Sequence, residues 1–540
     1  MSAPAALYTG GVIETLEPGP RPAALATAGD RIVATGDAAA CRAALAAAGA
    51  ADFAHVDLAG RALLPGFIDT HLHPIMLVYF DANADLRGVR SVAQLQAELR
   101  ARACALAPGE WLIGLQLQDE DLAERRLPTA AELDAACADR PVVVVEHDGH
   151  SAVGNGLALA AAGIDAASGD FGGRVARDAG GAPTGACFEA AAQRLLGAVP
   201  SPSLERLRET ARGTFARLAA HGITSAGVVL QTDAEGPAGA AGALEALALG
   251  LFLPELPFST YAILIGARAE AAVAARATPL HDPPAGRRVG GFKIFADGTF
   301  GSCTACMHEP FADRPGERGL WTHDPGELLA RMRGAHAAGL QICVHAIGDA
   351  AVERCVDGFE TLLAEAPRAD HRHRIEHASL VPPALVARIA RLGIAVSTQP
   401  LFISSEKAWL RRRLGAERAR HVYPLRALVD AGVLVGGASD APVESADVLH
   451  AIQCCVTREG FEPAQALTPL EALRLYTRDA ARLQFEEDEK GTLAAGKRAD
   501  LVVLSGSPLA CAPDRIAELR VLRTVHGGRI THDAEGGAMR

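Results

Sequence analysis

The clearest chemical signal in this sequence is a pair of histidines, His71 and His73, separated by one residue at the end of an apolar run. In an extended chain, residues i and i+2 point to the same side, so both imidazoles face one point. An isolated pair of this kind occurs by chance. Here it follows Pro65-Gly66-Phe67-Ile68-Asp69, which places it at the end of a strand. The pair is therefore predicted to hold one Zn²⁺-like ion.

Four further residues with suitable chemistry stand in or at the ends of other strand-like runs. They are Lys293, His345, His377 and Asp440. Neutral imidazoles with one or two carboxylates form a donor set that suits Zn²⁺. A lysine inside an apolar strand is costly as an ammonium, whereas its neutral amine, after capture of CO₂, becomes a carbamate that bridges two ions. Asp440 would bind one ion and take the proton from the attacking water.

Taken singly, each residue has a simpler structural interpretation. His345 or His377 alone would be an ordinary hydrogen-bonded histidine. Lys293 alone could pair with Asp297 or extend to solvent from a strand end. Asp440 alone could cap a helix. Their joint occurrence at several strand ends favours a metal site.

Parallel βα units are predicted to position these side chains. Short apolar strands alternate with Ala- and Leu-rich helical stretches, including 326–339, 384–392 and 469–482, between the two ends of the chain. The predicted strands are 63–69, 223–229, 258–264, 290–296, 341–345, 373–377, 394–398 and 433–439. Eight such units predict a distorted (β/α)₈ TIM barrel, an α/β fold, in which strand ends 1, 4, 5, 6 and 8 converge on one mouth.

The two ends of the chain and one long gap complete the predicted organisation. Short strand-like runs in 1–62 and 490–540 predict a small composite β-sandwich, and 63–80 with 216–489 form the barrel. About 150 residues separate the first barrel strand from the second, far more than an ordinary connection. We interpret 81–215 as an inserted lid or substrate domain, because an insertion after strand 1 emerges where barrel active sites lie.

Composition excludes several classes of protein. The chain has 540 residues, of which 49% are hydrophobic and 21% charged, so it is not disordered as a whole. With 52 basic and 64 acidic residues its formal net charge is −12, which disfavours nucleic acid and anionic membranes as partners. The expected partner is a small-molecule substrate, and a homodimer is the prior expectation for the assembly. Eleven scattered cysteines and no signal-like run at Met1–Thr9 predict a cytoplasmic location.

At this point the sequence resembles the amidohydrolase superfamily, and more closely its YtcJ-like branch, amidohydrolase family 3, which includes N-substituted formamide deformylases. The resemblance covers nearly the whole chain. The matching segments are 292–298, 345–350, 374–377, 439–443, 148–151 with Asn155, 467–472 and 491–501.

The resemblance implies a metal-dependent hydrolase of an amide or other C–N bond. The implied ligands are His71, His73, carbamylated Lys293, His345, His377 and Asp440, around one or two Zn²⁺ ions, with Mn, Fe or Co as alternatives. Asp440 is also the implied catalytic residue. Two departures stand out: Cys303 replaces the usual Arg, and Leu115-Gln116 replaces a frequent Gly-Trp pair. The candidate substrate contacts are Asp148, His150, Asp297 and Cys303.

Two other functions are compatible with the sequence. One is a mononuclear deaminase of the same superfamily. Such enzymes commonly use a His-x-x-Glu arrangement, whereas His345 is followed by Ala-Ile-Gly-Asp. The other is a catalytically silent metal-binding scaffold, which the complete ligand set disfavours.

Overall fold

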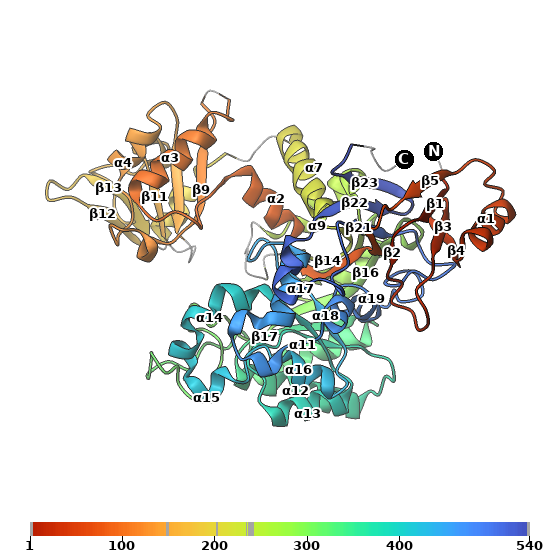
Figure 1. Ribbon diagram of the computed structural model, residues 1–540. Helices are drawn as coiled ribbons and strands as arrows, with labels where there is room; N and C mark the ends of the chain where they lie inside the picture. Colours follow the sequence, from red (N-terminus) through yellow and green to blue (C-terminus); the bar gives the residue numbers. More distant parts are fainter. Residues whose placement is uncertain are drawn as a thin grey trace. The chain divides into compact units, whose positions relative to one another are not determined.

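The computed structural model describes residues 4–107, 109–146, 151–188, 190–200, 204–233, 235 and 242–536. The chain divides into two compact units. One comprises Met1–Ile75 with Phe215–Arg540, and the other comprises Met76–Thr214. Figure 1 shows the elements of both.

The first unit contains an eight-stranded parallel sheet. Its order is β20-β19-β18-β17-β16-β15-β14-β7. The strands are β7 Phe67–Leu72, β14 Ile223–Gln231, β15 Ser259–Ile265, β16 Arg287–Phe295, β17 Gln341–Ala346, β18 Arg374–His377, β19 Ala395–Thr398 and β20 Val435–Gly437. Continuous burial along β7 and β14 is typical of parallel strands covered on both faces.

The two outer strands of this sheet, β7 and β20, meet through single hydrogen bonds. The Asp440 N–H donates to the His71 carbonyl at 2.8 Å, and the Thr70 hydroxyl donates to the Gly437 carbonyl at 3.0 Å. These contacts bring the first strand back to the last. The sheet is therefore a nearly closed barrel, which confirms the predicted fold class.

The structure corrects the predicted first strand, 63–69. That run forms two strands, β6 Ala62–Pro65 and β7, with Gly66 between them. β6 pairs with a C-terminal strand outside the barrel. At Gly66 a Cβ atom would lie 2.2 Å from the Thr224 hydroxyl oxygen, so the chain changes sheets where only glycine fits. The run 63–68 is apolar on both sides of Gly66, so no polar residue marks the change in the sequence.

Helices accompany the barrel strands. They are α9 Glu245–Phe252, α10 Ala269–Ala275, α11 Pro325–Ala337, α12 Asp349–Glu365, α13 Pro383–Leu392, α14 Leu401–Leu414, α15 Ala416–Ala419, α16 Leu425–Asp430, α17 Val448–Thr457, α18 Pro469–Leu475 and α19 Arg478–Leu483. The helix predicted at 469–482 is thus two helices. The first begins with a capping box in which Thr468 and Glu471 satisfy each other's backbone N–H groups.

Strands from both ends of the chain form the β-sandwich in the same unit. One sheet has the order β4-β3-β1-β5 and the other β2-β6-β21-β22-β23. The additional strands are β1 Ala6–Thr9, β2 Val12–Ile13, β3 Ala24–Ala28, β4 Arg31–Gly36, β5 Ala54–Asp57, β21 Leu501–Leu504, β22 Val521–His526 and β23 Arg529–Asp533, and α1 is Ala38–Ala47. Tyr8, Leu25, Leu63 and Leu501 belong to one buried apolar cluster that joins the two sheets. In Figure 1 the red N-terminal and blue C-terminal strands gather in one region.

The second unit has a six-stranded sheet of its own, in the order β12-β13-β11-β10-β9-β8. Its elements are β8 Ala84–Asp85, α3 Val92–Ala103, β9 Leu112–Leu117, α4 Ala130–Ala136, β10 Val142–Glu146, β11 Ser151–Gly154, α5 Gly156–Ala162, β12 Arg174–Arg177, β13 Pro183–Phe188 and α6 Ala190–Leu196. Helices α2 Pro74–Ala82 and α7 Leu204–Ala220 span its two boundaries. The role of this unit as a lid stays a prediction.

Of the helices in the described part of the chain, none is both long enough and apolar enough to span a bilayer.

Candidate metal centre

The barrel brings all six predicted metal ligands to the carboxyl ends of its strands. His71 lies in β7, with His73 directly after it, and Lys293 lies in β16. His345 lies in β17, His377 is the last residue of β18, and Asp440 follows β20. Parallel strands end at the same face of a barrel, so residues far apart in sequence become neighbours.

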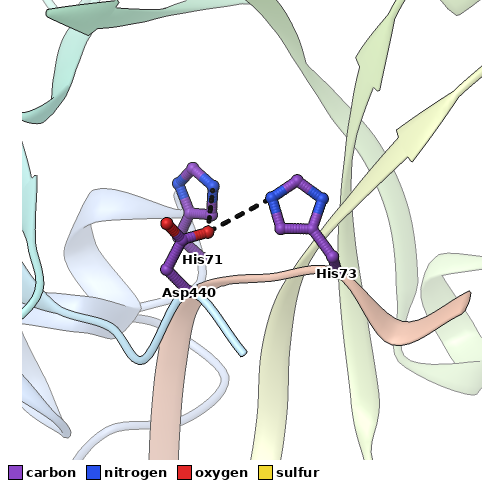
Figure 2. Close-up of side chains that lie close together, drawn as sticks. All are labelled: His71, His73 and Asp440. Carbon is purple, nitrogen blue, oxygen red and sulfur yellow. Dashed lines mark ion pairs between the residues drawn. The ribbon is translucent and has the colours of Figure 1, made fainter. Parts of the chain in front are cut away.

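His71, His73 and Asp440 form the tightest group (Figure 2). Oδ1 of Asp440 lies 3.4 Å from Nε2 of His71 and 3.2 Å from Nε2 of His73. Asp440 has φ +59°, a left-handed conformation that is uncommon for a residue with a side chain. This backbone turn occurs just where its carboxylate meets the two imidazoles, at a site that stores strain.

Lys293 lies against this group. Its Nζ is 3.4 Å from Nε2 of His71 and 5.1 Å from the centre of the Phe295 ring. The residue is 2% exposed, and among the described residues no carboxylate lies within ion-pair distance of its Nζ. Burial lowers the pKa of Lys293 because it penalises the ammonium form.

His345 and His377 complete the group. Their ring centres are 4.5 Å apart, and the His377 ring lies 5.4 Å from that of His71. Nδ1 of His377 is 2.8 Å from Oε1 of Gln399, and Phe402 stacks on the other side of the ring. Nε2 of His345 is 3.1 Å from the Gly298 carbonyl oxygen. These contacts hold both imidazoles in place.

A buried Arg374–Glu376 ion pair contacts His71 at Nδ1, the ring nitrogen that does not face Asp440. Nδ1 of His71 lies 2.6 Å from Oε2 of Glu376, and the other oxygen of Glu376 accepts a 2.5 Å hydrogen bond from Arg374. Arg374 also donates to the Thr70 carbonyl at 3.0 Å. A carboxylate on the far nitrogen of a ligating histidine fixes its tautomer and orientation.

Sequence reasoning missed this role of Glu376. One signal was available: Arg374 and Glu376 are two charged residues at i and i+2 in a short strand whose residues are all buried. Because side chains alternate along a strand, Arg374 and Glu376 lie on the same side of β18 and His377 lies on the other.

Asp69 is a second residue that the sequence analysis did not single out. Its Oδ1 accepts hydrogen bonds from the backbone N–H of His71 at 3.0 Å and from that of Ser439 at 3.2 Å. It therefore ties the strand that carries the histidine pair to the strand end before Asp440. Burial raises the pKa of Asp69 to about 7.

The local electrostatics favour the neutral forms of His71 and His345. Burial and the nearby Lys293 lower the pKa of His71 to about 4 and that of His345 to about 3. Burial alone would raise the pKa of Asp440, but the surrounding imidazoles hold it below its ordinary value. Neutral histidines and an ionised carboxylate are the forms that bind a metal.

These residues fit a divalent metal ion. Oδ1 of Asp440 is buried and has no hydrogen-bond partner within the described part of the chain. A buried carboxylate oxygen in that state is costly unless a cation satisfies it. It shares its surroundings with two imidazole nitrogens, and a set of nitrogen and carboxylate donors suits Zn²⁺ and related ions.

The four predicted substrate contacts have different surroundings. Asp148 and His150 lie outside the described residues. Asp297 is buried, and its carboxylate accepts backbone N–H groups of Cys306, Ile347 and Gly348 at 2.8–3.0 Å. That set of bonds describes a residue that organises the loops around His345.

Cys303 is 7% exposed and has φ +58°. It packs in an apolar cluster that includes Phe300, Met307 and Phe402. Burial raises the pKa of its thiol. Through Phe402 this cluster reaches the His377 ring, but a direct contact of Cys303 with substrate stays a prediction.

A barrel with neutral histidines and an orphaned carboxylate at its carboxyl mouth defines a metal-dependent hydrolase. Residues 54–532 match the amidohydrolase family. The chain is 31% identical over 497 residues to a Bacillus subtilis (strain 168) protein named "Putative amidohydrolase YtcJ", covering 90% of this chain and 92% of the relative. It is 29% identical to an N-substituted formamide deformylase of Arthrobacter pascens, covering 91% and 92%.

A solved structure agrees with these relatives. It is an uncharacterized metal-dependent hydrolase from Pyrococcus furiosus, with a TM-score of 0.74 and 28% identity, covering 94% of this chain and all of the other. The chain belongs to the amidohydrolase family. Its class is that of metal-dependent hydrolases acting on carbon–nitrogen bonds.

Proposed function

We propose that this enzyme cleaves small N-acyl compounds at a two-metal centre in which carbamylated Lys293 bridges the ions. His71, His73, His345, His377 and Asp440 would supply the remaining ligands. When bound, the ions would lower the pKa of a water molecule and polarise the carbonyl group that it attacks. The observation that carries the proposal is the orphaned, buried Oδ1 of Asp440 facing two imidazole nitrogens.

Lys293 supports the two-metal form of the proposal. The buried amine beside His71 has no carboxylate partner in the described part of the chain, and burial lowers the pKa of Lys293, which shifts it toward the neutral form. The neutral amine attacks CO₂, an N–C bond forms, and the nitrogen releases a proton. The product would be a carbamate, which would supply an anionic ligand to the metal centre.

Asp440 is assigned the proton transfer. Its carboxylate would accept the proton that the attacking water loses and return it to the leaving nitrogen. Asp69 and the backbone of β7 hold this strand end in position through the bonds to Ser439 and Asp440. The chain would thus supply the proton shuttle from the eighth strand and the fixed imidazoles from the first.

Elemental analysis tests the number of ions. Protein purified without a chelator or a histidine tag is analysed for zinc, manganese, iron and cobalt. Two equivalents per chain, with an intact-mass increase equal to one CO₂ that disappears in Lys293→Met, are expected. One equivalent of metal per chain and an unmodified Lys293 would contradict the two-metal centre. That result would favour a mononuclear deaminase instead.

A substrate panel tests the reaction. Metal-loaded protein is incubated with N-substituted formamides, acetamides and lactams, and the released amine is measured. The formamides are included because one relative is named for that activity, although Cys303 marks a difference in this chain. Turnover of at least one C–N substrate that Asp440→Asn abolishes is expected, whereas ammonia release from aminated heterocycles alone would contradict the proposal.

A further inference from the structure

A second cavity lies at the opposite end of the barrel, where its strands begin. It has a volume of about 430 Å³ and is lined by the early parts of β15, β16 and β17 and by the turns that precede them. This volume lies in the range of about 300–1,000 Å³ that is typical of small-molecule sites. The metal centre lies at the carboxyl ends of the same strands, so the two sites are distinct.

Three arginines line this cavity: Arg276, Arg288 and Arg368. All three are half-buried, and among the described residues none has a carboxylate within 4.0 Å. Their hydrogen bonds go to backbone carbonyls instead. Arg276 donates to Val289 and Gly339, Arg288 to Phe485, and Arg368 to Leu340 and His336.

These bonds leave donors free. A guanidinium carries five N–H donors in a fixed plane, and each of the three uses only one or two of them on carbonyl oxygens. The carbonyl contacts therefore position the groups without neutralising them. Partly buried cations without anionic partners are uncommon, because burial of an unpaired charge is costly.

The single carboxylate of the cavity does not offset this charge. Asp370 is engaged by Arg372, whose Nε and Nη2 donate to its two oxygens at 2.7 and 2.8 Å. The cavity therefore carries three arginines without an ion-pair partner among the described residues, in a protein whose net charge is −12.

Aromatic side chains complete the lining of this cavity. Tyr261 and Phe485 add aromatic surface beside the arginines.

The neighbouring histidines respond to the same positive field. The pKa of His281 is lowered by burial and then by Arg276 and Arg288. The pKa of His371 is lowered by burial, and Arg368 adds to this effect. Both imidazoles line the cavity and would remain neutral hydrogen-bonding groups.

We propose that this cavity is a binding site for a small organic anion whose phosphate or carboxylate group is held by Arg276, Arg288 and Arg368. Guanidinium groups match the planar, multidentate geometry of both anions. The aromatic wall favours an anion that carries an organic portion over a bare inorganic ion. The site binds its ligand independently of the hydrolytic reaction at the other end of the barrel.

Calorimetric titration of the metal-loaded protein with phenyl phosphate and, separately, with benzoate tests the proposal. We expect saturable binding of at least one probe at one site per chain, and the tighter probe identifies the anionic group. Arg288→Gln should weaken binding roughly tenfold or more, since a hydrogen bond to a charged group contributes about 1.5–3 kcal/mol. Among the described residues the Arg288 side chain makes one hydrogen bond, to the Phe485 carbonyl, so this variant disturbs the fold least.

Two further variants keep the test decisive. Arg333→Gln removes the same charge from an exposed ion pair with Glu365 on α11 and should leave binding unchanged. Arg276→Gln replaces Arg288→Gln if thermal denaturation shows that the latter is unfolded. The proposal would be overturned if the wild-type protein and the folded cavity variants bound the probe with equal affinity, as expected for an anion bound at the metal centre. It would also be overturned if neither probe showed saturable binding.

Discussion

Asp440 combines a strained backbone, a buried carboxylate and close contact with two imidazoles. Its φ of +59° turns the chain just after β20, and its N–H is bonded to the His71 carbonyl at 2.8 Å. The backbone thus holds the carboxylate in position, while Oδ1 has no hydrogen-bond partner among the described residues. A side chain held in this way is available for a cation and for proton transfer.

Asp440→Asn should therefore separate metal binding from catalysis. The amide preserves shape and one ligand oxygen, but it cannot accept the proton from water. We expect kcat to fall about 10²–10⁴-fold, the usual contribution of a positioned acid–base group, with metal retained in elemental analysis. Asp430→Asn, at an exposed ion pair with Arg426, is the matched control. A fully active Asp440→Asn enzyme would rule out the assigned role.

Glu376 acts through His71 and is a positioning residue. Glu376→Gln removes the charge that orients the imidazole and should lower metal affinity about 10–100-fold in competition with a chelator. It also leaves Arg374 buried without its partner, at a cost of about 3–5 kcal/mol in the free energy of unfolding.

A control distinguishes these two effects of the Glu376 substitution. Glu471→Gln breaks the ion pair with Arg426 and the capping box of α18, away from the site. It should lower the melting temperature without changing metal affinity. If Glu376→Gln likewise loses only stability, the positioning role is wrong.

At the scale of elements, the close approach of β7 and β14 decides where the histidine pair lies. Gly227 stands in β14, and a Cβ atom there would lie 2.1 Å from the Thr70 carbonyl oxygen. Thr70 precedes His71, and its hydroxyl is 2.8 Å from the Ser397 hydroxyl in β19. The glycine therefore allows β7 to sit against its neighbour with His71 at the centre of the barrel.

Gly227→Ala should move β7 and impair the metal centre. We expect a loss of about 1–3 kcal/mol in the free energy of unfolding, as for other overpacked cores, together with weaker metal binding. Gly250→Ala in α9 introduces the same methyl group where no atom lies within 4 Å. There we expect a stabilisation of about 0.5–1 kcal/mol. Denaturant titration and chelator competition measure both effects, and unchanged metal binding in Gly227→Ala would contradict this account.

At the scale of the whole molecule, the sandwich and the barrel belong to one compact unit. β6 pairs with β21, and the chain passes from β6 into β7 through Gly66 alone. A disturbance in the sandwich core should therefore reach the barrel. Trp321 and Trp409 report on the barrel because they lie in this unit outside the sandwich strands.

Leu501→Ala should destabilise this unit as a whole. Leu501 is 0% exposed in the core shared by strands from both chain ends, and truncation of such a leucine costs about 2–5 kcal/mol. We expect the unfolding midpoint followed by tryptophan fluorescence to shift together with that followed by circular dichroism. Leu470→Ala, at a partly exposed position, should change stability by less than about 0.5 kcal/mol. A fluorescence midpoint that stays in place would mean that the sandwich unfolds separately.

The local part of the site could be predicted from the sequence. The spacing of His71 and His73 places both imidazoles on one side of a strand end, and Lys293, His345, His377 and Asp440 follow from the same reasoning about strand ends. The barrel was predictable because eight apolar runs alternate with helical ones. The boundary at Gly66 was not, because the run 63–68 is apolar on both sides of the glycine although its two halves join different sheets.

The support of the ligands depends on contacts between residues far apart in the sequence. Glu376 meets His71 across 305 residues, and no local spacing predicts which carboxylate stands behind which imidazole. The same holds for Asp297, whose bonds to three backbone N–H groups depend on how two loops fold around it. Local periodicity governs which side of an element a side chain occupies, whereas the order and curvature of the sheet govern which sides meet.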